Sequence, residues 1–169
     1  MCETLLELAK GSGIMDSLDY QILSILKKNA RIKASDISKE IHLSVSTVIE
    51  RIRKLENSGI IESYTIITDE HKMGNDLTAL MEISLTHPRF NDSFIEKIME
   101  HPNIISCYYL TGDFDYLVKI CCRSSEHLEQ IHKWVKDQRG VRSTRTQFVL
   151  RNVKNIYTSL PEPSPEDNA

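Results

Sequence analysis

Hydroxyl-bearing and basic side chains cluster within residues 44–54, and side chains of these types suit contacts with nucleic acid. Serine and threonine can hydrogen-bond to base edges, while arginine and lysine can bind guanine or phosphates. Ser44 could also place a backbone N–H group on a phosphate if it begins a helix. The alternative is an ordinary charged helix face in contact with solvent. The residues that we expect to contact double-stranded DNA are Ser44, Ser46, Thr47, Glu50, Arg51, Arg53 and Lys54.

A second candidate site is the turn at residues 111–116, which reads Thr-Gly-Asp-Phe-Asp-Tyr. Gly112 permits a tight turn and leaves backbone N–H groups free to bind a carboxylate. Asp113 or Asp115 could then accept an α-ammonium group, and threonines on a neighbouring strand could add hydroxyls. The alternative is a β-turn whose aspartates bond to their own backbone. The candidate ligand-binding residues are Thr111, Gly112, Asp113, Asp115, Thr144 and Thr146.

Residues typical of catalysis or metal binding do not form a recognisable motif. The four cysteines, at 2, 107, 121 and 122, form no CxxC pair, and no zinc-type cluster accompanies them. Three of these cysteines lie in apolar runs and are expected to be reduced core or interface thiols. His127 and His132 are five residues apart, so they are expected to be surface residues rather than paired ligands. The sequence predicts no catalytic residue, no metal and no cofactor.

The candidate DNA contacts would be positioned by a helix-turn-helix. Apolar spacing predicts helices at 18–29, 34–41 and 45–58 with a sharp turn between the second and third. Ser17 and Ser44 are the expected N-caps, and Gly59 is expected to end the last helix. A helix placed third in this way enters the major groove with its first residues towards the bases.

The candidate ligand turn would belong to a second domain. Residues 60–67 are β-branched and aromatic and predict a strand, while the polar residues 68–76 predict a linker. Beyond the linker the pattern is β-α-β-β-α-β, the ferredoxin-like split βαβ arrangement. Its expected strands and helices are 77–85, 91–100, 104–110, 115–122, 124–138 and 141–150.

Composition is ordinary for a soluble globular protein, and the order of the expected elements gives an α+β fold class. The chain has 169 residues, of which 40% are hydrophobic and 27% charged, with a net charge of −3. No apolar run approaches the roughly 20 residues that span a bilayer, and the start lacks the pattern of a signal peptide, so we expect a cytoplasmic protein. The expected domains are an extension at 1–14, the helix-turn-helix at 15–67, the linker at 68–76, a ligand-sensing and oligomerisation domain at 77–156, and an acidic Pro-rich tail at 157–169.

Two blocks of residues resemble the Lrp/AsnC (feast/famine) transcription regulators. The N-terminal block comprises Leu18-Asp19, Ile22-Leu23, Leu26, Asn29 to Ile32, Leu43-Ser44, Arg51 to Glu56, Gly59 to Ile61 and Tyr64. The C-terminal block comprises Gly112 to Lys119, Gly140-Val141, Thr144, Thr146 and Val153-Lys154. The resemblance spans roughly residues 16 to 156, in the order and spacing of the family.

The resemblance implies a winged-type helix-turn-helix followed by a βαββαβ effector domain. It implies a homodimer, often assembled into a ring of four dimers, and an amino acid or related metabolite bound where dimers meet. It also implies a prokaryotic, nucleoid-associated protein. His42 departs from the family, because glycine is usual in this turn, and so does Glu50, where a basic residue is frequent. An architectural DNA-binding protein and a haem-precursor decarboxylase-like enzyme remain alternative interpretations.

Overall fold

The computed structural model of the chain describes residues 15–160, so the predicted extension at 1–14 and residues 161–169 of the predicted tail lie outside the described residues. The chain divides into two compact units. The first contains the described residues up to Ile66 together with those from Ile156 onward, and the second is Ile67–Asn155. No helix in the described range 15–160 is long and apolar enough to cross a membrane.

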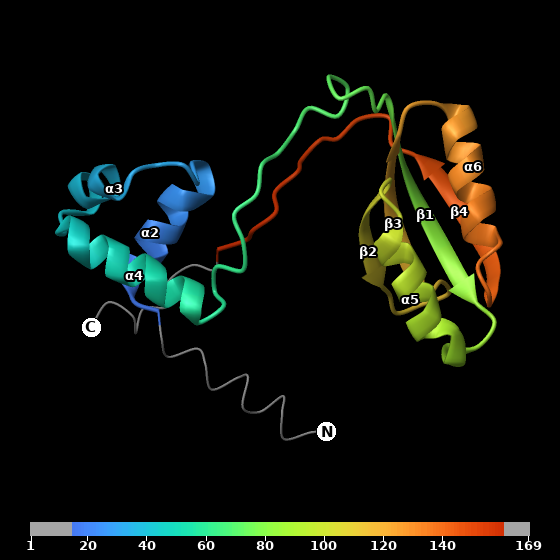
Figure 1. The fold of residues 1–169 in the computed structure, drawn as a ribbon, viewed down its shortest axis with the longest axis horizontal. Helices are drawn as coiled ribbons and strands as arrows, with labels where there is room; N and C mark the ends of the chain where they lie inside the picture. The colour runs from blue at the N-terminus through green and yellow to red at the C-terminus, as the bar shows by residue number, and fades with distance from the viewer. Residues whose placement is uncertain (1–14, 161–169) are drawn as a thin grey trace. The chain divides into compact units, whose positions relative to one another are not determined.

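Helices α2 (Ser17–Lys28), α3 (Ala34–Ile41) and α4 (Val45–Asn57) form the first unit (Figure 1). Apolar residues recur at helical spacing in each of them, so each presents one stripe to a shared core. The buried residues of that core are Ile22, Leu23, Ile25, Leu26, Ile37, Ile41, Val48 and Leu55. The three helices were predicted to within one residue at each end.

The ends of these helices explain the angle between α3 and α4. His42 adopts the left-handed conformation with φ 55°, in which glycine would be unstrained, and Ser44 caps α4 by accepting a hydrogen bond from the Thr47 N–H. The N-cap of α2 is Asp16, and the prediction of Ser17 was wrong. Asp16 and Asp19 bind each other's backbone N–H groups, a reciprocal capping box that a serine at the first helical position does not offer.

Residues 60–67 form no strand in the described chain, so that prediction was wrong. The β-branched residues favour an extended backbone. Ile66 and Ile67 are nevertheless 80% and 67% exposed, and they pair with no other segment of residues 15–160. A strand requires a partner, and side-chain propensity alone does not supply one. The linker after it turns at residues 70–74.

Four strands of the described chain make one sheet in the order β2-β3-β1-β4, and every neighbouring pair is antiparallel (Figure 1). The strands are β1 (Leu77–Leu85), β2 (Ile104–Tyr109), β3 (Tyr116–Cys122) and β4 (Val141–Phe148). The short 3-10 helix η2 (Pro88–Phe90) leads into α5 (Asn91–Glu100), and α6 (Ser125–Lys136) connects β3 to β4. The βαββαβ prediction is confirmed.

Helices α5 and α6 cover one face of the sheet. Alternate residues of β1 and β3 meet them in a core that contains Met81, Val118, Phe94 and Ile131. Apolar spacing alone would also turn Ile95 and Met99 of α5 inward, but they are 41% and 77% exposed and lie outside this core.

The other face of the sheet carries half-buried apolar side chains. Leu80 and Leu117 lie there, and no element of residues 15–160 packs over them to complete their burial. An apolar sheet face normally packs against a second layer, and residues 15–160 of one chain do not supply that layer here.

Candidate DNA interface and ligand turn

The first turn of α4 gathers hydroxyl groups at the surface. The Ser44 Oγ lies 2.8 Å from the Ser46 Oγ and 2.7 Å from the Thr47 Oγ1, and it accepts from the Thr47 N–H at 3.1 Å. Ser44 and Ser46 are exposed, while Thr47 is half-buried. These hydroxyls satisfy one another without DNA and can rotate to meet base edges at small cost.

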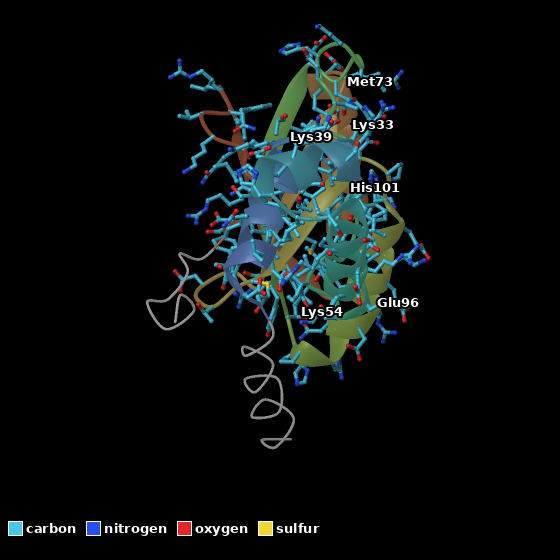
Figure 2. The ribbon with its side chains drawn as sticks, turned by 90° about the vertical axis from the view of Figure 1, so that its left-hand side faces the viewer. Lys33, Lys39, Lys54, Met73, Glu96 and His101 are labelled. Carbon is cyan, nitrogen blue, oxygen red and sulfur yellow. The ribbon has the colours of Figure 1, made fainter. Side chains whose placement is uncertain are left out.

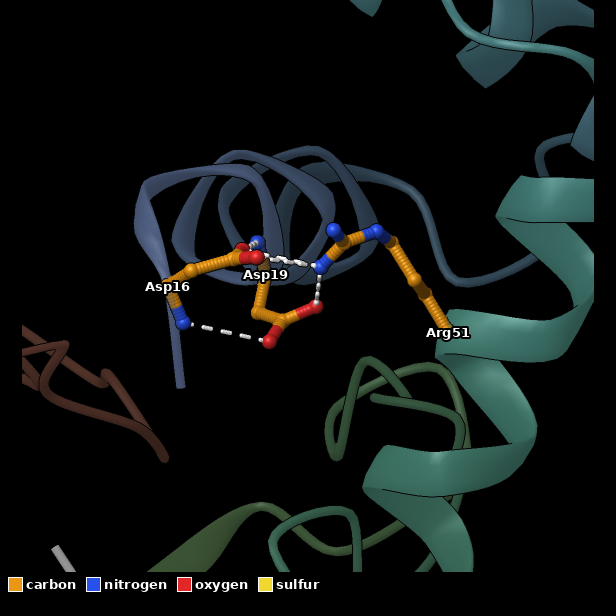
Figure 3. A network of polar contacts seen from close by, with 3 residues as sticks. All are labelled: Asp16, Asp19 and Arg51. Carbon is orange, nitrogen blue, oxygen red and sulfur yellow. Dashed lines mark hydrogen bonds and ion pairs between the residues drawn. The ribbon is translucent and has the colours of Figure 1, made fainter. Parts of the chain in front are cut away.

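Arg51 is turned away from this surface. Its guanidinium lies 2.7 Å from the Asp19 carboxylate and 2.8 Å from that of Asp16, at the start of α2 (Figure 3). Asp19 is 1% exposed, so its charge is held by Arg51 rather than by water. The hydrogen bond to Asp19 raises the pKa of Arg51. Arg51 was expected to reach a guanine or a phosphate, whereas the structure engages it in fixing α4 against α2.

Asp16 is the more exposed carboxylate of this network. Partial burial alone would raise its pKa, but the Asp19 backbone N–H and the Arg51 guanidinium together lower the pKa below its usual value. The ionised form of Asp16 is therefore the one that the fold favours.

The remaining charged candidates on α4, Glu50, Arg53 and Lys54, are exposed. Further basic side chains, which the sequence interpretation did not single out, surround the turn between α2 and α3 and the start of α3. They are exposed at Lys27, Lys28, Arg31 and Lys33, and Lys33, Lys39 and Lys54 are labelled in Figure 2. A count of lysine and arginine around the second helix would have found them.

The candidate ligand turn is anchored to the end of β1. The Asp115 N–H donates to the Ile83 carbonyl at 3.0 Å, and the Asp115 carboxylate accepts from the Leu85 N–H at 2.6 Å. Ser84 donates its hydroxyl to the Asp113 carbonyl at 3.0 Å. The Asp115 carboxylate therefore already serves a backbone group, as in the alternative interpretation, although that backbone belongs to β1 rather than to the turn.

Thr111, Gly112 and Asp113 form the exposed tip of the turn. Gly112 has a φ of 125°, a conformation that side chains disfavour, so the sequence requires glycine here. The tip presents the backbone and one carboxylate to solvent.

Thr144 and Thr146 were expected on a strand next to the turn, and this was wrong: β1 lies between β3 and β4. Their register partners Ile83 and Met81 face the helices, so both threonines share the helix-covered face. The Thr144 Oγ1 lies 3.0 Å from the Nε2 of His132, while the buried Thr146 Oγ1 has no hydrogen-bond partner among the described residues.

Arg145, between these threonines, reaches the turn instead. Its guanidinium lies 4.7 Å from the centre of the Phe114 ring and forms an ion pair with Glu82 on β1. Sequence reasoning missed Arg145 because alternation along β4 becomes informative only when the order of the strands is known.

Two cysteines and two histidines that the sequence singled out lie in or beside the core of this unit. Cys121 and Cys122 are buried and free, and desolvation raises the pKa of the Cys122 thiol. The expectation that His127 and His132 lie at the surface was wrong, since both are half-buried. Within residues 15–160, no three histidine, cysteine or acidic side chains are grouped to hold a metal ion.

Comparison with known protein families gives two matches, one for each unit. The family described as winged helix-turn-helix DNA-binding matches residues 15–62, and the Lrp/AsnC ligand binding domain matches residues 78–158. The HTH-type transcriptional regulator FL11 of Pyrococcus furiosus is 34% identical over 149 residues, which cover 88% of this chain and 97% of that protein. The HTH-type transcriptional regulator LrpB of Bacillus subtilis is 37% identical, covering 86% of this chain and 96% of its own length.

Solved structures of similar fold cover most of the chain. A transcriptional regulator from Neisseria meningitidis in complex with L-Met has a TM-score of 0.82 at 27% identity, covering 87% of this chain and 96% of its own. AsnC of E. coli has a TM-score of 0.78 at 27% identity, covering 84% of this chain and 96% of its own.

Proposed function

We propose that this chain, which belongs to the Lrp/AsnC family of transcription regulators, reads a specific operator with the N-terminal part of α4 and couples that reading to an amino acid bound at the turn 111–115. Its relatives are transcriptional regulators rather than enzymes, so the chain is a regulator and the decarboxylase-like interpretation is set aside. Its N-terminal unit is a DNA-binding domain, and its C-terminal unit is a ligand-binding domain.

The observation that carries the DNA proposal is the exposed first turn of α4. Ser44, Ser46 and Thr47 offer hydroxyls for base edges, and Glu50 can accept from the amino group of cytosine. Arg53 and Lys54, with the basic residues around α3, supply phosphate contacts that place the helix. In this proposal Arg51 supports α4 from behind and does not read a base.

The experiment is a titration of operator fragments obtained by genome-wide mapping of bound DNA. Ser46→Ala and Thr47→Ala are expected to lower the preference for operator over random DNA, because base contacts carry the sequence information. Arg53→Ala is expected to weaken binding to both DNAs and to flatten the dependence on salt by about one unit of slope.

Lys136→Ala is the matched control, because Lys136 is an exposed basic residue of α6 in the ligand-binding unit. Equal affinities of the wild type and all α4 variants for the operator would remove α4 from the interface. Equal affinity of the wild type for operator and random DNA would instead support the architectural alternative, since binding through backbone contacts alone is insensitive to sequence.

The effector proposal rests on the exposed tip of the turn. Backbone N–H groups beside Gly112 can hold a carboxylate, and Asp113 can hold an ammonium group. The Neisseria relative binds L-Met, which makes methionine the first compound to test in a thermal-shift screen of the common amino acids. Stabilisation by none of them at millimolar concentration would overturn this part of the proposal.

The proposed assembly is a homodimer through the uncovered sheet face, built further into a ring of four dimers. A dimer would complete the burial of Leu80 and Leu117 and would present two copies of α4 to DNA. Sedimentation of the full chain tests this, and Leu117→Lys is expected to shift the protein towards monomer.

We also propose that the regulator lies in the cytoplasm and is associated with the nucleoid. Co-sedimentation of the protein with cellular DNA tests this.

A further inference from the structure

A pocket of about 530 Å³ opens beside α5, where η2 meets the loop between α6 and β4. Arg89 and Phe90 line it from one side, and Gln138 and Arg139 line it from the other. None of residues 111–115 contributes to its wall, so it is separate from the candidate ligand turn. A volume of this size is typical of sites for small metabolites.

Two guanidinium groups lie against one aromatic ring in this pocket. The Arg89 guanidinium is 4.8 Å from the centre of the Phe90 ring, and the Arg139 guanidinium is 5.4 Å from it. In the part of the chain that the structure describes, neither arginine forms an ion pair with a carboxylate. Stacking holds both cations near one another while their N–H donors remain available.

The wall of the pocket is held in place by close packing and backbone bonds. Gly140 has a φ of 92°, and a Cβ built on it would lie 2.4 Å from the Phe90 ring. The Thr86 N–H donates to the Gly140 carbonyl at 2.7 Å, and the Gln138 amide donates to the Trp134 carbonyl at 2.8 Å. The loop that carries Arg139 is therefore fixed against Phe90 before any ligand arrives, which lowers the entropic cost of binding.

The charge of the pocket is positive. Its lining includes three cationic side chains, Arg89, Lys97 and Arg139, against the single carboxylate of Glu96 on α5. Lys97 is also bonded to Glu100 at 2.9 Å, so the two arginines carry most of the available attraction. Guanidinium groups recognise carboxylates and phosphates through paired N–H donors.

We propose that this pocket binds a compact dianion between Arg89 and Arg139, as a second ligand position of the domain. The shared chemistry is two negative charges on a small polar head, which either a phosphate group or a dicarboxylate supplies. The charge surplus of the lining matches such a ligand, and the partly exposed ring of Phe90 gives its carbon skeleton an apolar contact.

The test is calorimetric titration of the full chain with inorganic phosphate and, separately, with succinate, at constant ionic strength. Saturable binding at millimolar concentration is expected for at least one of them. Binding of phosphate alone identifies a phosphate group, binding of succinate alone identifies a dicarboxylate, and binding of both identifies any compact dianion. Saturable binding of neither overturns the proposal.

The matched variants locate the binding. Arg89→Gln combined with Arg139→Gln is expected to weaken binding by roughly tenfold or more, because charge-assisted hydrogen bonds are lost. Arg142→Gln removes an exposed arginine of β4 outside the pocket and is expected to leave the affinity unchanged. Equal weakening by Arg142→Gln, or no weakening by the double variant, overturns the site.

A second pair of substitutions covers the case in which the glutamines disturb folding. Arg89→Lys with Arg139→Lys keeps both charges but removes the paired donors, and an intermediate loss of affinity is expected. Asp113→Asn at the separate turn should leave the anion affinity as it is, so failure of the effector proposal and failure of this one are distinguishable. Affinity unchanged in the lysine pair would contradict recognition by guanidinium groups.

Discussion

The guanidinium of Arg51 on α4 and the buried carboxylate of Asp19 in the first turn of α2 lie 2.7 Å apart (Figure 3). Asp16 completes the network from the N-cap of α2. Asp16 and Asp19 therefore cap the start of α2 and, through Arg51, also orient α4. An arginine that belongs to a recognition helix by sequence is, in this fold, part of the support of that helix.

Arg51→Ala is expected to lower the free energy of unfolding of the helical unit by roughly 1–3 kcal/mol, because the buried Asp19 carboxylate loses its partner. Denaturation by urea followed by circular dichroism measures this. Arg53→Ala is the control on the same helix; Arg53 is exposed, and its loss is expected to change stability by at most about 0.5 kcal/mol. If Arg51→Ala keeps full stability but binds the operator weakly, Arg51 contacts DNA rather than supporting α4.

Asp16→Asn tests the charge in this network while keeping a good N-cap residue. The folded state lowers the pKa of Asp16, so the ionised carboxylate contributes stability above its ordinary value of 3.8. That contribution is lost as the pH falls through the lower pKa of the folded state. Wild type is expected to be more stable than the variant at pH 7, and the two are expected to converge in acid.

Measurement of both proteins by thermal unfolding from neutral pH down to pH 2 checks this expectation. Asp16 is half-exposed, so the difference is expected to shrink in high salt as well. A difference that persists unchanged at the acid end would mean that charge is not its source.

Much of the fold could be predicted from local pattern. Apolar residues occupy every odd position of the strand Leu77–Leu85, and Ser44 precedes an amphipathic run, so their bounds follow from periodicity and capping. Residues 60–67 show the limit of this approach, because a β-branched segment without a partner strand has the propensity of a strand and none of its hydrogen bonds.

The sites were less predictable because they depend on contacts distant in sequence. The partner of Arg51 is 32 residues away, so no local pattern distinguishes an arginine that supports the helix from one that reads DNA. Thr144 and Thr146 were expected on a strand next to the turn because sequence does not give the order of the strands, and β1 separates their strand β4 from β3. The position of Arg145 beside the turn and the pocket around Phe90 likewise could not be predicted without the order of the strands and the contacts between distant segments.

Gly140→Ala is expected to destabilise the protein more than Gly74→Ala does. Both glycines have positive φ, 92° and 83°, so either alanine carries backbone strain of about 1–2 kcal/mol. A Cβ at Gly74 meets nothing within 4 Å, whereas one at Gly140 would overlap Phe90. Thermal unfolding of the two variants separates the overlap from the strain.

The double variant Phe90→Ala with Gly140→Ala provides the check. Removal of the ring relieves the overlap, so Gly140→Ala is expected to cost less in that background than in the wild type. Equal losses at Gly74 and Gly140 would mean that the loop moves away from Phe90 without penalty, and that the loop carrying Arg139 is not fixed against the ring.

The two aspartates of the turn are expected to respond in opposite ways to removal. Asp115 binds the Leu85 N–H at 2.6 Å, so Asp115→Ala leaves that half-buried donor without its acceptor and is expected to cost roughly 1–3 kcal/mol of stability. Asp113 is exposed at the tip, so Asp113→Ala is expected to leave the melting temperature of the unliganded protein nearly unchanged.

If the turn holds an amino acid through Asp113, the Asp113→Ala variant alone should lose the stabilisation by the effector while it still binds the operator. The measurement is the shift of melting temperature for both variants with and without the compound found in the thermal-shift screen. If the compound raises the melting temperature of Asp113→Ala as much as that of the wild type, this carboxylate does not hold the ligand and the turn has a structural role only.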